Sequence, residues 1–172
     1  MERAWIITWG VGIAALPLAA LTVYLLYRRR QPDAAALRTS IADVAMVVGT
    51  LPWLYLTLRP VPNGPERVYL VPFEDITTLP EDILFVQVVG NLLIFAPLGF
   101  FLPVRWEAFA SIWRVLGVGA AASCAIEITQ LLVGSGRVTS IDDVLLNALG
   151  AALAACLSRP WWRREQEAAR MP

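Results

Sequence analysis

Five long apolar runs constrain this chain more than any other feature of its sequence. A helix of about 20 apolar residues, rising about 1.5 Å per residue, crosses a hydrocarbon core about 30 Å thick. Arg28, Arg29 and Arg30 follow the first run, whereas a secretory signal peptide carries its positive charge in front. The pattern predicts an all-α, polytopic integral membrane helix bundle with about five transmembrane helices. The runs cover residues 4–27, 41–58, 83–102, 109–133 and roughly 140–162.

The composition agrees with a membrane protein and excludes several kinds of site. Hydrophobic residues make up 58% of the chain and charged residues 16%, which is too apolar for an ordinary soluble domain. The 14 acidic residues balance the 14 basic ones, all of them arginine, so nothing indicates a nucleic-acid partner. The chain has no histidine, which excludes His-based metal sites and catalytic triads with a His base. We expect neither a metal nor a cofactor.

The arginines predict how the chain is oriented in the membrane. Five spans place nine arginines on the side of the C-terminal tail and four on the side of residues 59–82 and 134–143. The side richer in arginine is normally cytoplasmic, so the N-terminus is predicted outside and the C-terminus inside. The chain would then comprise an anchor helix at 1–30, a transmembrane domain at 41–162 and a cytoplasmic polar tail at 163–172.

Polar residues gather near the predicted outer ends of the last three spans. Counting inward at about 1.5 Å per residue places Asn91 at ~12 Å, Glu127 at ~9 Å and Asn147 at ~6 Å. A charge at the bilayer centre costs ~2.5–3.5 kcal/mol on insertion scales, so intramembrane acids are functional candidates. The shared depth predicts a polar pocket that opens at the outer leaflet. Its candidate ligand-binding residues are Asn91, Glu127, Gln130, Arg137, Asp142, Asp143 and Asn147.

Arg137 lies in the short loop above this layer, and two interpretations of it remain open. Its planar guanidinium could bind a carboxylate or a phosphate through two parallel hydrogen bonds. It could instead neutralise Glu127 or Asp143 and so allow a buried acid to exist. Neutralisation needs one partner, whereas the sequence supplies six polar groups at one depth. This surplus favours the ligand-binding interpretation.

Other residues are predicted to have structural roles. Pro97 has no N–H to donate to Leu93, so the freed Leu93 carbonyl must find another partner inside the protein, and Gly99 follows Pro97 closely. Ser123 lies on a polar, small-residue face of the fourth span, and Gly150 lies on a similar face of the fifth. Such faces pack against other helices rather than against lipid.

Capping patterns predict where helices begin. Ser140 and Asp143 have the spacing of a capping box at the head of the fifth span, so capping alone could explain Asp143. Asp43 lies in the predicted first turn of the second span, where the helix dipole favours an acid. The connection at 59–82 holds five prolines and is predicted to contain no helix.

Three motifs in this region resemble those of a known family. They are NLLIFAPLGF from Asn91, the pair Glu127 and Gln130, and Gly136-Arg137 followed by Asp142, Asp143 and Asn147. The pattern is similar to that of the VanZ-like family, membrane proteins named for a member associated with resistance to teicoplanin. The resemblance covers about residues 41 to 157. Ser140 stands where relatives often carry a further aspartate, which argues against a mechanism with three clustered acids in that loop.

The resemblance implies a helical integral protein of the bacterial plasma membrane that acts at the cell envelope. The preferred prediction is a non-enzymatic protein that binds the polar or anionic head group of a membrane lipid, a lipid-linked envelope component or a lipoglycopeptide antibiotic such as teicoplanin. One alternative is a membrane-embedded hydrolase or transferase that uses Glu127, Asp142 and Asp143 as acid/base groups or as ligands for a hard cation. Another is a structural or assembly subunit.

Overall fold

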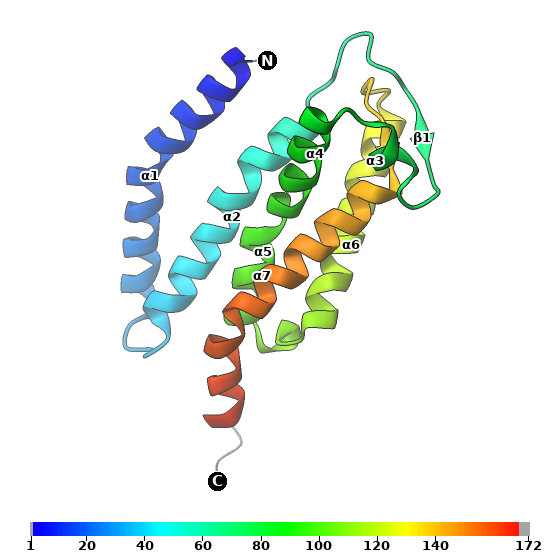
Figure 1. The fold of residues 1–172 in the computed structure, drawn as a ribbon. Helices are drawn as coiled ribbons and strands as arrows, with labels where there is room; N and C mark the ends of the chain where they lie inside the picture. Colours follow the sequence, from blue (N-terminus) through cyan, green and yellow to red (C-terminus); the bar gives the residue numbers. More distant parts are fainter. Residues whose placement is uncertain (1, 169–172) are drawn as a thin grey trace.

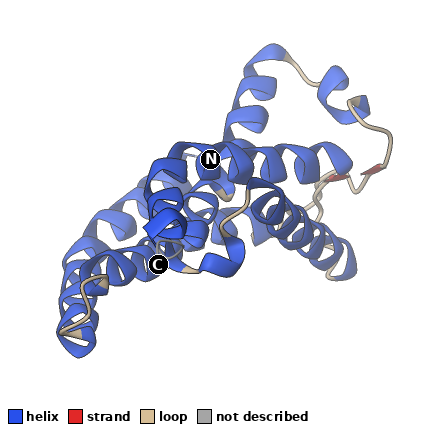
Figure 2. Ribbon diagram, turned by 90° about the horizontal axis from the view of Figure 1, so that it is seen from below, coloured by secondary structure: helices blue, strands red, loops and turns tan. Residues whose placement is uncertain are grey.

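The computed structural model confirms an all-α protein. It describes residues 2–168 and, among these, the side chains of residues 13–163. The two strands that it contains have two residues each (Figure 1, Figure 2). In chain order the elements are α1 (Glu2–Arg30), α2 (Ala36–Leu58), β1 (Val68–Tyr69), α3 (Glu74–Thr78), α4 (Glu81–Ile94), α5 (Ala96–Arg105), the 3-10 turn η1 (Glu107–Phe109), α6 (Ile112–Leu132), β2 (Thr139–Ser140) and α7 (Ile141–Ala168).

Four stretches of the described chain are long and apolar enough to cross a membrane, where five were predicted. They are α2, the α4–α5 pair, α6 and the part of α7 from Ile141 to Arg163. The difference lies in α1, because its described side chains, residues 13–30, end in three consecutive arginines. The apolar part of that stretch, residues 13–27, is shorter than the about 20 residues that a span needs. The predicted span at 4–27 begins earlier, so part of it lies outside the described side chains.

The span Glu81–Arg105 is interrupted at Phe95, which separates α4 from α5. Phe95 has φ −105° and ψ 10°, which is not α-helical, and Pro97 follows two residues later. Pro97 lacks the N–H that would bond the Leu93 carbonyl. The helix resumes directly, because the Gly99 N–H donates to the Phe95 carbonyl at 2.8 Å. The Leu93 carbonyl accepts the Phe95 N–H instead, which is the partner within the protein that the sequence predicted for it.

Helix α7 packs against α4, α5 and α6, while α2 packs against α5 and α1 packs against α2 (Figure 1). Two glycines permit the close approach of α7. A Cβ on Gly99 would overlap the backbone of Ala151, and a Cβ on Gly150 would overlap the Leu92 carbonyl. Small residues at these crossings allow the helix backbones to touch, which is how helices pack without a hydrophobic driving force in lipid.

The loop between α2 and α4 and the loop between α6 and α7 meet at one end of the bundle. The same end holds the start of α1, and α7 ends at the opposite end (Figure 1). A short parallel ladder joins the two loops, with Val68 paired to Thr139 and Tyr69 paired to Ser140. The segments that the sequence placed on one side of the membrane therefore lie together at one end of the molecule.

The prediction that residues 59–82 contain no helix is wrong, because α3 lies within them. All five prolines of this connection fall outside Glu74–Thr78. The Asp142 carboxylate, at the head of α7, accepts hydrogen bonds from the Phe73 N–H at 2.6 Å and the Ile76 N–H at 3.2 Å. A side chain from α7 thus satisfies N–H groups at the start of α3.

Two other predicted boundaries differ from the structure. Helix α2 begins at Ala36, so Asp43 lies beyond its first turn and does not cap it. The Asp43 carboxylate instead pairs with Arg30 and Arg105 from neighbouring helices. Helix α7 continues to Ala168, so the first residues of the predicted polar tail are helical, and residues 169–172 lie outside the described chain.

Candidate functional site

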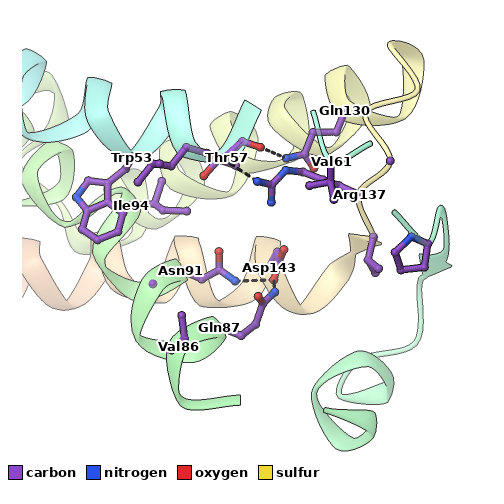
Figure 3. Close-up of a pocket in the computed structure, with 15 residues that line it drawn as sticks. Trp53, Thr57, Val61, Val86, Gln87, Asn91, Ile94, Gln130, Arg137 and Asp143 are labelled. Carbon is purple, nitrogen blue, oxygen red and sulfur yellow. Dashed lines mark hydrogen bonds between the residues drawn. The ribbon is translucent and has the colours of Figure 1, made fainter. Parts of the chain in front are cut away.

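A cavity of about 370 Å³ lies between α2, α4, the head of α7 and the loop that follows α6. Its polar side chains form two facing walls (Figure 3). Arg137 and Gln130 lie on the side of α2, and Gln87, Asn91 and Asp143 lie on the side of α4 and α7. The remaining lining comes from Trp53, Leu56, Thr57, Val61, Pro65, Val86, Gly90, Ile94, Gly136 and Val138.

Arg137 is held in the cavity wall by the backbone of the α2 end. Its Nε donates to the Arg59 carbonyl at 3.0 Å and its Nη2 donates to the Leu56 carbonyl at 2.8 Å. The loop that carries it is docked on the same segment, because the Val61 N–H donates to the Ser135 carbonyl at 2.8 Å. Gly136 permits this contact: its φ is +69°, and a Cβ there would overlap the Val61 carbonyl.

These contacts make Arg137 a cap for the C-terminus of α2. The last carbonyls of a helix have no partner within the helix, and the negative end of its dipole favours a cation. Gln130 contributes to the same cap, since its Nε2 donates to the Thr57 carbonyl at 2.8 Å. All acceptors that Arg137 finds are therefore neutral. Its Nη1 donates to no acceptor within the described chain.

No carboxylate pairs with Arg137 in the described chain, although the sequence offered Glu127 and Asp143 for that role. The ion pairs described are those of Asp43 with Arg30 and Arg105. Burial lowers the pKa of the Arg137 guanidinium, and the negative charges of Asp143 and Glu127 oppose this shift. Arginine is effectively always protonated in proteins, so a cation without a directly paired anion faces the cavity.

Asp143 forms the opposite polar wall, and it does not cap α7 as the capping-box pattern predicted. Its Oδ1 accepts hydrogen bonds from Gln87 Nε2 at 2.7 Å and from Asn91 Nδ2 at 2.5 Å. Two neutral amides from α4 therefore hold this carboxylate. Gln87 was not among the predicted ligand-binding residues, although its spacing of four residues from Asn91 places both amides on one helix face.

The other predicted polar residues lie behind this wall rather than in it. Glu127 accepts a hydrogen bond from the Ser140 N–H at 3.2 Å, which joins α6 to the start of α7. Ser123 accepts one from Asn147 Nδ2 at 2.7 Å, and the Asn147 Oδ1 is buried without a partner in the described chain. Ser140 Oγ accepts the Asp142 N–H at 3.1 Å, so Ser140 caps α7 as predicted.

The structure therefore divides the seven candidates into two groups. Asn91, Gln130, Arg137 and Asp143 line the cavity, whereas Glu127, Asp142 and Asn147 bond neighbouring segments outside it. Within the described residues, no group of three or more acids and cysteines is arranged to hold a metal ion. The acids that an enzyme would combine as acid/base groups are thus engaged separately, with backbone N–H groups or with amides.

Comparison with known proteins bears on this site directly. A family model described as VanZ/LLP1 matches residues 44–163, which is more than half of the chain. The match contains every residue that lines the cavity and leaves out α1. Searches of curated proteins and of solved structures gave no match.

Proposed function

The chain belongs to the VanZ/LLP1 family of membrane proteins, and from this premise we propose that it binds the anionic head group of a lipid or lipid-linked envelope component in the cavity beside Arg137. The observation that carries the proposal is the state of Arg137. Its guanidinium lines a cavity of about 370 Å³ while its two described hydrogen bonds go to neutral carbonyls.

Capping of α2 does not by itself require a charged residue that borders a cavity. Gln130, a neutral amide, bonds another carbonyl of the same helix end, that of Thr57. An arginine in this place adds a positive charge and a third nitrogen, Nη1, that remains available. A planar guanidinium binds carboxylate and phosphate groups through two parallel hydrogen bonds, so this arginine is suited to an anionic ligand.

The opposite wall would orient the head group that Arg137 attracts. Asp143 has its Oδ1 occupied by Gln87 and Asn91, and neither of its oxygens contacts a cation in the described chain. The negative charge of Asp143 disfavours an anion on that side, and its carboxylate oxygens accept hydrogen bonds from hydroxyl or ammonium groups. A ligand with an anion at one edge and donors at the other fits both walls, as many phospholipid head groups do.

We place this cavity at the outer leaflet, following the arginine distribution that puts residues 59–82 and 134–143 outside. Single cysteines at Glu66 and Gln31 test the orientation, because both positions are exposed and lie at opposite ends of the bundle. The background should carry Cys124→Ala and Cys156→Ala. An impermeant thiol reagent added to intact cells is expected to label position 66 and to spare position 31, and the reverse result would move the cavity to the cytoplasmic side.

Lipid extraction and mass spectrometry of the purified protein test the binding proposal. The wild type is expected to retain an anionic lipid, and Arg137→Lys to lose about tenfold or more of it, because a lysine lacks the planar fork and hydrogen bonds to charged groups contribute ~1.5–3 kcal/mol. Arg67→Lys is the matched control, since Arg67 is an exposed arginine of the same end of the molecule. Equal lipid retention in both variants would contradict the proposal.

A second variant separates loss of ligand from loss of fold. Gly90 lines the cavity, and a Cβ there meets no atom within 4 Å, so Gly90→Leu introduces a side chain at the cavity wall with no clash at its Cβ. A leucine also favours the helix by up to about 1 kcal/mol over glycine. Gly117→Leu on α6 is the control, because Gly117 is equally unobstructed and lies outside the cavity. We expect both variants to be stable and only Gly90→Leu to lose the lipid.

A further inference from the structure

A second, apolar groove of about 390 Å³ begins where the polar cavity ends. Trp53 lines both spaces, and Figure 3 shows its indole at the end of the polar cavity away from Arg137. Ile94 lines the cavity and its neighbour Leu93 lines the groove. The groove thus continues the cavity along the surface of the bundle. It is lined by Trp53, Leu93, Ala96, Pro97, Phe100, Phe101, Ala154 and Leu157, none of which is charged.

The groove runs in the direction that a lipid chain would take from a head group in the cavity. Along α4 and α5 the lining passes from Gln87 and Asn91 in the cavity to Phe100 and Phe101 in the groove. From Asn91 to Phe100 is nine residues, or roughly 13 Å of helix at 1.5 Å per residue. This distance is close to one leaflet of a hydrocarbon core that is ~30 Å thick. On α7 the lining passes likewise from Asp143 to Ala154 and Leu157.

We infer that the ligand is a phosphate-bearing acyl lipid, with its phosphate at Arg137 and one acyl chain lying over Trp53 in the groove of α2, α5 and α7. This inference rests on the proposed function and adds the chemical class of the ligand. A soluble phosphate compound would use the polar cavity alone and leave the groove to bulk lipid. An acyl lipid uses both, because its chain lies against the apolar lining of the groove while its phosphate reaches Arg137.

Photo-crosslinking of the full chain in phosphatidylcholine nanodiscs tests the inference. The probe is phosphatidic acid with a diazirine midway along one acyl chain, and phosphatidylcholine with the same chain reports on ordinary surrounding lipid. Adducts are mapped by mass spectrometry of peptides. We expect phosphatidic acid adducts to concentrate in residues 93–101 and 154–157 beyond the level of the phosphatidylcholine probe, and this excess to disappear in Arg137→Lys.

A groove variant isolates the acyl chain from the head group. Ala96→Phe fills the groove from a half-buried position. It should lower the phosphatidic acid adducts in the groove to the level of the phosphatidylcholine probe, because the phenyl ring occupies the space that the acyl chain needs. Ala121→Phe is the matched control, since Ala121 is an exposed alanine on α6 outside the groove, and it should leave the excess unchanged.

The failures of the two proposals are distinguishable. If phosphatidic acid is retained in an Arg137-dependent way but its adducts are spread evenly over the lipid-facing helices, the groove assignment is overturned and the head-group proposal stands. If glycerol 3-phosphate displaces the probe as well as lysophosphatidic acid does, the ligand is a soluble phosphate compound and the inference is again overturned. If phosphatidic acid shows no dependence on Arg137, both proposals fail.

Discussion

Arginines at the two ends of this bundle are bound in different ways. At the end that holds the connection between α1 and α2, Asp43 pairs with Arg30 at 2.6 Å and with Arg105 at 2.7 Å. Each oxygen of this carboxylate is used, and the three residues tie α1, α2 and α5 together. At the other end, Arg137 borders a cavity and bonds two backbone carbonyls.

The comparison indicates what each arginine is for. An opposite charge stabilises a half-buried charge, and Asp43 supplies this to two arginines. The same chain places Glu127 and Asp143 near Arg137 but directs both to other partners. An arginine kept apart from available carboxylates is suited to an anion that arrives from outside, so the Asp43 cluster is structural and the Arg137 cavity is the candidate for binding.

The largest effect is expected from breaking the Asp43 cluster. Asp43→Asn removes the charge that holds Arg30 and Arg105, and hydrogen bonds to charged groups contribute ~1.5–3 kcal/mol, so we expect the free energy of unfolding to fall by about 2–3 kcal/mol. Thermal or denaturant unfolding in detergent measures the change. Asp82→Asn, an exposed acid of the α4 first turn, should cost less than about 1 kcal/mol. We expect the Asp43→Asn variant to retain lipid. Loss of lipid in this variant would contradict the assignment of a purely structural role to the Asp43 cluster.

A smaller effect is expected from a double-mutant cycle at the other end. Arg137→Ala removes two hydrogen bonds to carbonyls and should cost ~1–3 kcal/mol. Because Glu127 bonds the Ser140 N–H and does not pair with Arg137, the cycle of Glu127→Gln with Arg137→Ala should give a coupling energy of only about 0.5 kcal/mol. The cycle of Asp43→Asn with Arg105→Ala should give more than about 1 kcal/mol. A coupling of several kcal/mol between Glu127 and Arg137 would show that the arginine neutralises a buried acid after all.

The parts of this molecule that follow from local physics could be predicted from its sequence. Apolar runs of about 20 residues specified α2, the α4–α5 pair, α6 and α7, because a helix must be that long to cross the bilayer. Pro97 marked the interruption after α4, and Ser140 marked the start of α7. The spacing of Gln87 and Asn91 also indicates the second amide that holds Asp143, because residues four apart lie on one helix face.

The remaining features depend on contacts between segments far apart in the chain. Arg137 bonds the carbonyls of Leu56 and Arg59, about 80 residues earlier, and every helix has such terminal carbonyls, so no residue type signals this partnership. Helix α3 forms where Asp142 can reach the Phe73 N–H, in a connection whose five prolines predict a loop. The two pairs of Asp43 likewise require that α1 and α5 lie beside α2.

The smallest effect is expected at Asp75, which lies in α3 beside the cavity end of the molecule and is buried. Burial raises the pKa of the Asp75 carboxyl and the charge of Asp142 adds to this, while a hydrogen bond from Ser140 opposes it. The folded protein therefore binds a proton at a pH where the unfolded chain has lost it. Stability falls with rising pH wherever the folded state holds more protons than the unfolded state. Lowering the pH through the folded pKa of Asp75 toward its unfolded pKa should therefore raise the free energy of unfolding. The side chain of Asp75→Asn cannot ionise. When the pH is lowered from about 7 to about 4, the stability of the wild type relative to this variant should therefore increase, as thermal unfolding can measure. A relative decrease over that range would mean that Asp75 is stabilised as an ionised carboxylate.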